Sequence, residues 1–408
     1  MNCSVFEKNR KKILEQMEDN SVLLAFSFAL SENKYDCNRN YFYLCGVIEY
    51  ENIVLLSKIG GKTNEMIFIN PYDELKAKWV GAPLSCDQVS NISGIANVYY
   101  LDTFDNVLNN LLNGKVDKLY IDFKKNDLKS IKTNEEVFAN NVKEKKPWVN
   151  IKNADGLFAH ARTSKSKEEV EEVSKAIEIT KAGIENMLAN MGPMYEYQLE
   201  SYFDQGIKYN GATGFAFPTI AASGENACCL HYSENNSMAK EGDLILFDLG
   251  ASYNMYNADI SRTFPVSGKF SERQKQIYNI VLEGQELVFN NIKPGITTRE
   301  LNGILVKYYA EKLKEIGLIT DPSEVSKYYY HGVSHHLGLE THDNCEYTPL
   351  VPGAIISNEP GLYIKEEGIG IRIEDDILVT EDGAINLSKD IIKTVEDIEA
   401  FIAAKKGI

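Results

Sequence analysis

Short apolar runs separated by polar breaks make up about the first 150 residues of the chain. Four of these runs have the length and composition of β-strands: SVLLAFSF, NIVLLSK, NEMIFINP and KLYIDF. Gly, Asn or Asp residues mark the breaks, and more polar segments lie between the runs. This alternation predicts an α/β layer at the N-terminal end.

The pattern changes after a lysine-rich passage, KKNDLKSIKTNEEVFANNVKEKKPW. The segment that follows, NADGLFAHARTSKS over 153–166, is the best candidate for a joint between domains. A chain of 408 residues is too long for one ordinary core. We therefore predict an N-terminal domain over residues 1–155 and a C-terminal domain over residues 156–408.

Helical periodicity begins directly after this joint. Ser166 and Glu169 form an S-x-x-E capping box, and apolar residues follow at helical spacing. A second helix is expected over about 195–209, and strands are expected over 215–264. The same order then recurs: a helix over about 271–289, a capping box at Thr297 and Glu300, another helix, and strands over 328–380. The repeat predicts a duplicated α+β domain with its two strand blocks side by side.

Four carboxylates and one histidine stand inside apolar stretches of this C-terminal half. They are Asp248 in LILFDLGA, Asp259 in YNADISRTF, His335 in HGVSHHLGL, Glu359 in ISNEPGLY and Glu374 in GIRIEDDIL. Carboxylates in apolar surroundings are costly to desolvate, and each pair about 4 Å apart repels by roughly 4 kcal/mol at an effective dielectric near 20. Two divalent cations that share a water or hydroxide would remove both costs.

Strand alternation supports this hypothesis. In GIGIRIEDDILV, the apolar residues alternate with Gly370, Arg372 and Glu374, so the last two project from the same face. A salt-bridged strand edge explains any one such residue equally well, but it does not explain all five together.

The histidines form a second signal. Five of the six, namely His231, His331, His335, His336 and His342, fall in two short stretches, ENACCLHYSEN and HGVSHHLGLETHD. A single histidine is more often a packing residue than a ligand. The spacing of His331 and His335 resembles a zinc protease helix, but Gly332 stands where that motif needs a glutamate.

Composition excludes several classes of partner. The 43 basic and 59 acidic residues give a net charge of -16, which argues against a nucleic-acid or anionic-membrane surface. The N-terminus has no apolar core of the signal-peptide type, and the longest apolar run, SVLLAFSFAL, is too short to span a bilayer. Seven cysteines without CxxC spacing indicate neither a disulfide framework nor a cysteine zinc site. We expect a cytoplasmic protein with reduced thiols.

The order of these motifs resembles the pita-bread metallopeptidases, and among them the Xaa-Pro aminopeptidases (aminopeptidase P) most closely. Asp248, ten intervening residues and Asp259 are followed by HGVSHHLGLETHD, NEPGLYI and GIGIRIEDD. The similarity includes GENACCLHYSEN, ADISRTFPVSGKFSERQKQIY and LSKDIIKTVEDIEAF, whereas YDCNRNYFYLCGV is a looser match. The resemblance implies a creatinase-like α/β domain followed by an α+β pita-bread domain with a pseudo-twofold duplication.

The resemblance also implies a dinuclear metal site and residue roles. The metal is usually manganese, with cobalt, zinc or iron as alternatives. Asp248 would chelate one ion, Asp259 and Glu374 would bridge both, and His335 and Glu359 would complete the second. In the implied reaction a metal-activated hydroxide attacks the peptide bond before proline. Further implied roles are Glu359 as general base, His342 at the scissile carbonyl, His231 on the other side of the substrate, and a proline pocket of His331, Tyr363 and Arg372.

Alternatives stay open at this stage. An Xaa-Pro dipeptidase (prolidase) has the same chemistry, and the fold also carries metal-free amidinohydrolases and peptide-binding modules that have lost catalysis. Asn344, Cys345 and Asn40 depart from the family pattern. The family is usually oligomeric, so we expect a homo-oligomer, dimer or tetramer, that acts on peptides with proline in second position. The sequence does not identify the preferred first residue or the group that binds the substrate amine.

Overall fold

The structure is a computed structural model that describes residues 1–27, 37–123, 129–346 and 349–407. Contacts divide the chain into two compact units, Met1–Arg162 and Thr163–Ile408. The division falls inside the predicted joint, but after residue 155. The joint is largely helical, because α7 occupies Asp155–Thr163. We describe each unit by itself.

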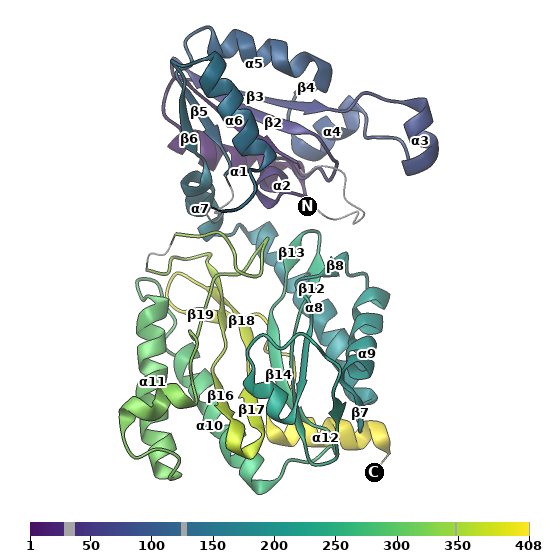
Figure 1. Cartoon of the computed structure of the whole chain (residues 1–408), viewed down its shortest axis with the longest axis vertical. Helices are drawn as coiled ribbons and strands as arrows, with labels where there is room; N and C mark the ends of the chain where they lie inside the picture. Colours follow the sequence, from purple (N-terminus) through teal and green to yellow (C-terminus); the bar gives the residue numbers. More distant parts are fainter. Residues whose placement is uncertain (28–36, 124–128, 347–348, 408) are drawn as a thin grey trace. The chain divides into compact units, whose positions relative to one another are not determined.

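A six-stranded mixed sheet organises the first unit (Figure 1). Its strand order is β4-β3-β2-β1-β5-β6, with β1 antiparallel to β2 and parallel to β5. The strands are β1 Ser21–Phe26, β2 Ile53–Ile59, β3 Lys62–Ile69, β4 Asn97–Tyr100, β5 Lys118–Ile121 and β6 Asn150–Asn153. The four predicted runs correspond to β1, β2, β3 and β5, although Phe28 of the first run lies outside the described residues. The sequence missed β4 and β6, which have no fully buried residue and therefore carry little apolar signal.

Helices pack around this sheet or project from it. They are α1 Cys3–Gln16, α2 Arg39–Cys45, α3 Glu74–Val80, α4 Cys86–Ser93, α5 Phe104–Leu112 and α6 Asn134–Lys145. Helix α3 buries none of its residues. Asn40, in α2, accepts a hydrogen bond from Arg162 at 2.6 Å and donates one to Asp122 at 2.9 Å, so a neutral amide links these two charged groups. Tyr35 and Asp36 of the looser family match lie outside the described residues.

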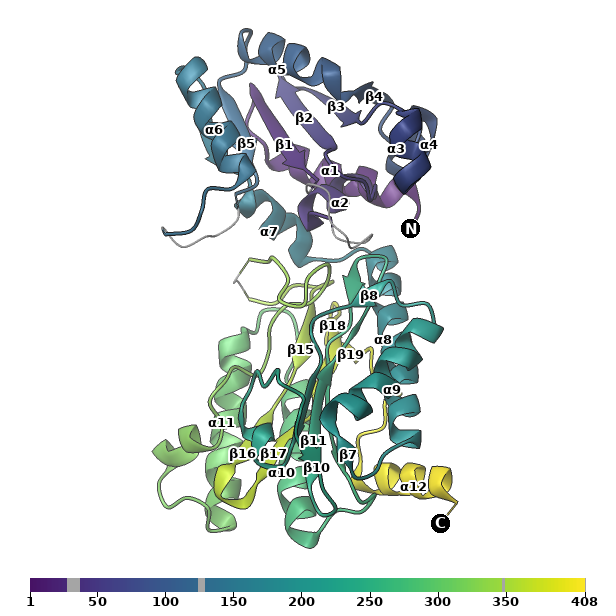
Figure 2. The same ribbon diagram turned by 45° about the vertical axis from the view of Figure 1, so that its right-hand side comes forward.

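The second unit contains the predicted duplication. Helices α8 Lys167–Ala189 and α9 Glu196–Tyr209 precede the first strand block, and α10 Glu272–Phe289 and α11 Thr298–Glu315 precede the second. The capping boxes at Ser166, Ser271 and Thr297 begin three of these helices. Figures 1 and 2 show the strands between α8 and α9 on one side and α10 and α11 on the other. The predicted α+β duplication is confirmed.

The strands of this unit form several small sheets. The first block comprises β8 Gly214–Phe215, β9 Ile220–Ser223, β11 Leu244–Leu249, β12 Ala251–Tyr253, β13 Tyr256–Asn257 and β14 Ile260–Pro265. The second block comprises β15 Ile355–Asn358, β16 Gly361–Ile364, β17 Ile369–Arg372, β18 Asp375–Val379 and β19 Ala384–Asn386. A short pair, β7 Met194–Tyr195 and β10 Met238–Ala239, and the C-terminal helix α12 Val395–Lys406 complete the unit. The 3-10 turns in the described part of the chain are η1 Leu101–Thr103, η2 Gly224–Cys228, η3 Pro322–Lys327 and η4 Lys365–Glu367.

One strand prediction was wrong. The second strand block was expected from residue 328, but its first strand begins at Ile355. The histidine-rich segment before it forms only an isolated bridge between His336 and Ile356. Its backbone is held instead by scattered contacts such as the bond from the Ser357 amide to the His335 carbonyl at 2.9 Å. Glycines and polar residues interrupt the apolar alternation there, so no continuous ladder forms.

No helix in the described part of the chain has the length and apolar character that crossing a membrane requires.

Candidate metal centre and active site

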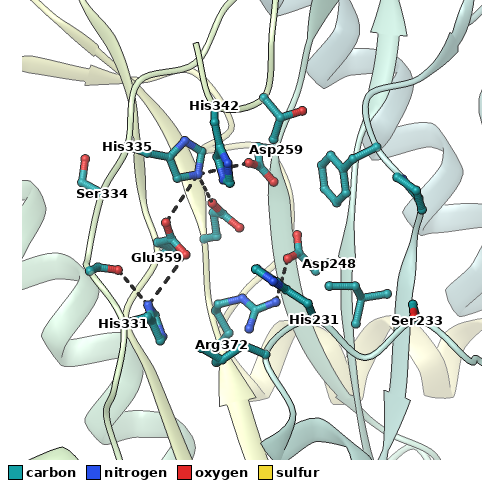
Figure 3. Close-up of a pocket in the computed structure, with 17 residues that line it drawn as sticks. His231, Ser233, Asp248, Asp259, His331, Ser334, His335, His342, Glu359 and Arg372 are labelled. Carbon is teal, nitrogen blue, oxygen red and sulfur yellow. Dashed lines mark hydrogen bonds and ion pairs between the residues drawn. The ribbon is translucent and has the colours of Figure 1, made fainter. Parts of the chain in front are cut away.

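Five side chains from five separate segments line one cavity of about 550 Å³ (Figure 3). Asp248 lies in β11, Asp259 directly precedes β14, and Glu374 directly precedes β18. Glu359 lies in the turn between β15 and β16, and His335 lies in the irregular segment before β15. The strand blocks of the two halves therefore bring the predicted ligands together, although more than 120 residues separate Asp248 from Glu374.

His335 is the centre of this group. Its Nε2 lies 3.3 Å from Asp259 Oδ2, 3.4 Å from Glu359 Oε1 and 3.9 Å from Glu374 Oε1. Its Nδ1 donates to the His336 carbonyl at 3.1 Å, which fixes the ring and leaves Nε2 facing the carboxylates. Asp259, His335 and Glu374 can offer ligand atoms that all lie within 4.8 Å of one another.

The protonation of the group indicates a need for positive charge. Burial raises the pKa of Asp259 to about 7, and it raises the pKa values of Glu374 and Glu359 as well. Burial alone would lower the pKa of His335, but the hydrogen bond and the negative charge of Asp259 outweigh burial and raise it to about 10. Bound protons thus offset the negative charge of the carboxylates, as metal cations would.

The donor set fits divalent metal ions. It combines four carboxylates with one imidazole, which suits first-row divalent metals. Asp248 Oδ1 is buried and has no hydrogen-bond partner among the described residues. An unpartnered buried carboxylate oxygen is costly unless a further ligand, such as a metal ion, satisfies it.

Arg372 contacts the ligand set through two neighbouring segments. Strand alternation placed Arg372 on the same face as Glu374, two residues away. Its Nη2 donates to Asp248 Oδ2 at 2.7 Å, and its Nε donates to Ser261 Oγ at 2.7 Å. Ser261 Oγ in turn donates to Glu374 Oε2 at 2.8 Å. Strand pairing explains why Arg372 reaches both Asp248 and Ser261, because β11 and β14 place these two residues opposite each other.

Two serines that the sequence analysis did not single out hold the ligands. Ser261 links Arg372 to Glu374, and Ser357 Oγ donates to Glu359 Oε1 at 3.1 Å while it accepts from the His335 amide at 3.0 Å. Both serines are fully buried. Each stands two positions from a predicted ligand, Asp259 or Glu359, so strand alternation was the signal that could have identified them.

His331 is held as a neutral ring with both nitrogens engaged. Arg372 Nη1 donates to the Tyr363 hydroxyl at 3.1 Å, so that hydroxyl donates its own proton to His331 Nε2 at 2.8 Å. His331 Nδ1 then carries the ring proton and donates to the Gly332 carbonyl at 2.7 Å. Burial lowers the pKa of His331 to about 4. His331 and Arg372 line the cavity, whereas Tyr363 is buried behind them.

The remaining histidines enter the cavity from two sides. His342 packs edge to face against His335, with ring centroids 4.4 Å apart, and burial lowers its pKa. His231 enters from the loop between β9 and β10 (Figure 3). Four apolar residues also line the cavity: Phe217, Pro218, Ile220 and Leu230.

Two family models match the chain. The model of metallopeptidase family M24 matches residues 171–381, and the model of the aminopeptidase P N-terminal domain matches residues 6–120. The first range contains all five candidate ligands.

Similar proteins cover nearly the whole chain. The Xaa-Pro aminopeptidase of Escherichia coli (strain K12) is 33% identical over 98% of this chain and 98% of its own length. Xaa-Pro aminopeptidase 3 of Rattus norvegicus is 31% identical over 89% of this chain and 76% of its own length. The structure of E. coli aminopeptidase P with the inhibitor Pro-Leu has a TM-score of 0.90 at 30% identity and full coverage of both chains. A Bacillus anthracis structure assigned to aminopeptidase P has a TM-score of 0.96 at 44% identity over 99% of both chains.

Proposed function

Since this chain belongs to metallopeptidase family M24, we propose that it is a metal-dependent Xaa-Pro aminopeptidase. It hydrolyses the peptide bond between an N-terminal residue and a following proline. The observation that carries this function is the convergence of four carboxylates and His335 in one cavity. Family membership also confirms the resemblance drawn from the motifs.

The metal centre that we propose holds two divalent ions, with manganese as the native metal and cobalt, zinc or iron as alternatives. Asp248 would hold one ion, Asp259 and Glu374 both, and His335 and Glu359 the second. When bound, two such ions lower the pKa of a water molecule and polarise the scissile carbonyl.

Glu359 is the group that moves the proton in this proposal. It accepts the proton of the attacking water and passes it to the leaving nitrogen of proline. Burial raises the pKa of Glu359, which favours its uptake of a proton from water. Ser357 keeps one carboxylate oxygen fixed while the other remains available.

His342 and His231 contact the substrate from opposite sides. The lowered pKa of His342 keeps its ring neutral, and its N–H then donates a hydrogen bond to the carbonyl oxygen and to the oxyanion that replaces it. His231 contacts the peptide backbone across the cavity. Among the described residues, neither ring forms a hydrogen bond that would compete with the substrate.

The proline ring fits the surface formed by His331 and Arg372. Both nitrogens of His331 already have partners, so the ring offers carbon atoms rather than a hydrogen-bonding edge. An Xaa-Pro bond has no N–H and needs no acceptor there. An extended backbone with a free N–H would leave that donor unsatisfied, which favours proline.

Oligomer formation is a further part of the proposal. Helix α3 and its flanks expose four large apolar side chains: Tyr72, Leu75, Trp79 and Val80. Trp79 is 83% exposed, and apolar clusters of this kind usually mark an interface. We propose that a second copy of the chain covers α3, and light scattering of a Trp79→Asp variant tests it. A smaller mass than that of the wild type supports the interface, whereas an unchanged mass contradicts it.

A cytoplasmic location completes the proposal. All seven cysteines lie within the described residues, and none forms a disulfide. This state suits a reducing compartment.

One experiment tests the function and separates it from its rivals. The purified protein is analysed for metal and then assayed with Xaa-Pro-Xaa tripeptides, Xaa-Pro dipeptides and Xaa-Ala-Xaa controls, with and without chelator. We expect chelator-sensitive cleavage of the tripeptide and loss of activity in Glu359→Gln, but not in Glu366→Gln, whose exposed carboxylate is outside the cavity. Cleavage of dipeptides alone identifies a prolidase. Absence of metal, with no effect of Glu359→Gln, identifies a binding module.

A further inference from the structure

The loop that carries His231 enters the cavity without regular pairing of its own. It connects β9 to β10 across residues 224–237 and contains only the 3-10 turn η2. Leu230, His231 and Ser233 of this loop line the cavity. Because no strand or α-helix fixes these side chains, their placement depends on contacts made elsewhere in the loop.

A single buried carboxylate, that of Glu196, accepts three hydrogen bonds from this loop and two more from the residue directly before it. Glu196 Oε1 accepts from the Ser223 amide at 2.7 Å, from Ser223 Oγ at 2.7 Å and from Asn226 Nδ2 at 3.1 Å. Its Oε2 accepts from the Tyr232 hydroxyl at 2.9 Å and from the Ser237 amide at 2.9 Å. These donors lie at both ends of the loop and in its middle.

The charge of Glu196 has no cationic partner. The side chain is 0% exposed, and among the described residues no lysine, arginine or histidine forms an ion pair with it. Two features offset the cost of desolvating this carboxylate: the hydrogen-bond donors of the loop, and the N-terminus of α9, where Glu196 is the first residue. Glu196 and the loop therefore fix each other.

The contacts on Oε2 include the residue next to His231. Tyr232 directly follows His231, so its hydroxyl bond restrains the backbone one residue from the ring that enters the cavity. The Glu196 amide also donates to the Ser237 carbonyl at 2.9 Å, which closes a two-way link at the end of the loop. Loss of these contacts would release His231 while the metal ligands, which lie on other segments, remain in place.

We propose that Glu196 is a positioning residue that holds His231 in place for the substrate. The inference rests on the proposed function, because it assigns His231 a contact with the peptide. A displacement of about 1 Å at such a contact can reduce the rate by about 100-fold.

Glutamine cannot replace Glu196 in this role. Its amide group has one acceptor oxygen and one NH₂ donor. Either orientation places the NH₂ group against at least two donors, because Oε1 accepts three hydrogen bonds and Oε2 accepts two. The isosteric change Glu196→Gln therefore removes the restraint with little change in volume.

Glu200 provides a matched control one helical turn further along α9. It accepts one hydrogen bond, from Asn235 Nδ2 at 2.9 Å, and a glutamine oxygen can accept that bond equally well. We expect Glu200→Gln to change kcat/KM by less than about twofold. A loss equal to that of Glu196→Gln would show that helix charge, and not loop positioning, is responsible, and would overturn the proposal.

A double-mutant cycle on kcat/KM with an Xaa-Pro-Xaa tripeptide tests the link to His231. We expect Glu196→Gln to lower kcat/KM by about 10- to 100-fold in the wild type and to have almost no further effect in His231→Asn, because the restrained ring is already absent. His342 lies on another segment, so we expect Glu196→Gln to cause its full loss of kcat/KM in the His342→Asn background. The inference is overturned if Glu196→Gln lowers kcat/KM equally in the wild type and in His231→Asn, or if it causes no loss in the wild type.

A second variant covers the case in which Glu196→Gln does not fold. Tyr232→Phe removes one donor only, and it should show a smaller loss with the same dependence on His231; a loss independent of His231 contradicts the proposal. Failure of the wild-type protein to cleave the tripeptide refutes the proposed function itself. Cleavage by the wild type with an additive cycle refutes only the role of Glu196.

Discussion

Replacement of Ser261 by alanine tests whether the polar links around the ligands govern metal binding. Ser261 is fully buried, and its hydroxyl accepts from Arg372 at 2.7 Å and donates to Glu374 at 2.8 Å. The change removes one oxygen atom and leaves the strand backbone unchanged. Glu374 is a proposed ligand of both ions, so loss of its orientation should appear in metal affinity.

The magnitude follows from the two hydrogen bonds. A bond to a charged group contributes about 1.5–3 kcal/mol, and removal of Ser261 breaks two of them. Arg372 keeps its bonds to Asp248 and Tyr363, so its own position changes little. The free energy lost at the metal site is therefore that of about one hydrogen bond, the bond to Glu374. This loss corresponds to a 10- to 100-fold weaker metal affinity.

Isothermal titration of metal into chelator-treated protein measures this change. Ser93→Ala is the matched control, because Ser93 is also fully buried and also uses its hydroxyl in two hydrogen bonds, but it lies in the first unit. We expect Ser93→Ala to lower the melting temperature without any change in metal affinity. An unchanged metal affinity in Ser261→Ala, with both variants folded, would refute the reasoning.

Three further predictions concern packing, pH and the His331 contacts. Gly370→Ala should destabilise the protein by about 1–3 kcal/mol in urea unfolding, because the added Cβ would clash with the Ala227 carbonyl oxygen. Gly303→Ala, at an open position in α11, should instead stabilise the protein by about 0.5–1 kcal/mol. Equal effects of the two substitutions would contradict this prediction. Burial, followed by the charge of Glu200, raises the pKa of Asp204 from 3.8 to about 6, so this group reduces stability as pH rises through that window. Asp204→Asn should therefore raise stability at pH 8 by about 1 kcal/mol, a value discounted for the partly exposed side chain, with no gain below pH 4; a gain independent of pH would exclude this cause. Tyr363→Phe removes the donor to His331 Nε2, and we expect a higher KM for proline peptides with unchanged metal content; an unchanged KM would rule out a role in substrate binding.

The sequence by itself determined those features whose signal is local. The capping boxes at Ser166 and Thr297 predicted where two helices begin, because a cap satisfies backbone donors within three residues. The five candidate ligands could be named because each is a polar or charged residue within an apolar stretch of sequence. The duplicated order of helices and strands followed from periodicity alone.

The tertiary structure decided the contacts between distant segments. The sequence placed Arg372 beside Glu374, but strand pairing brought Asp248 and Ser261 to it across more than 100 residues. The same holds for Glu196, whose partners begin 27 residues later and whose role has no local signal. Periodicity shows which face of an element a side chain occupies, whereas register and packing decide which side chain from another segment meets it there.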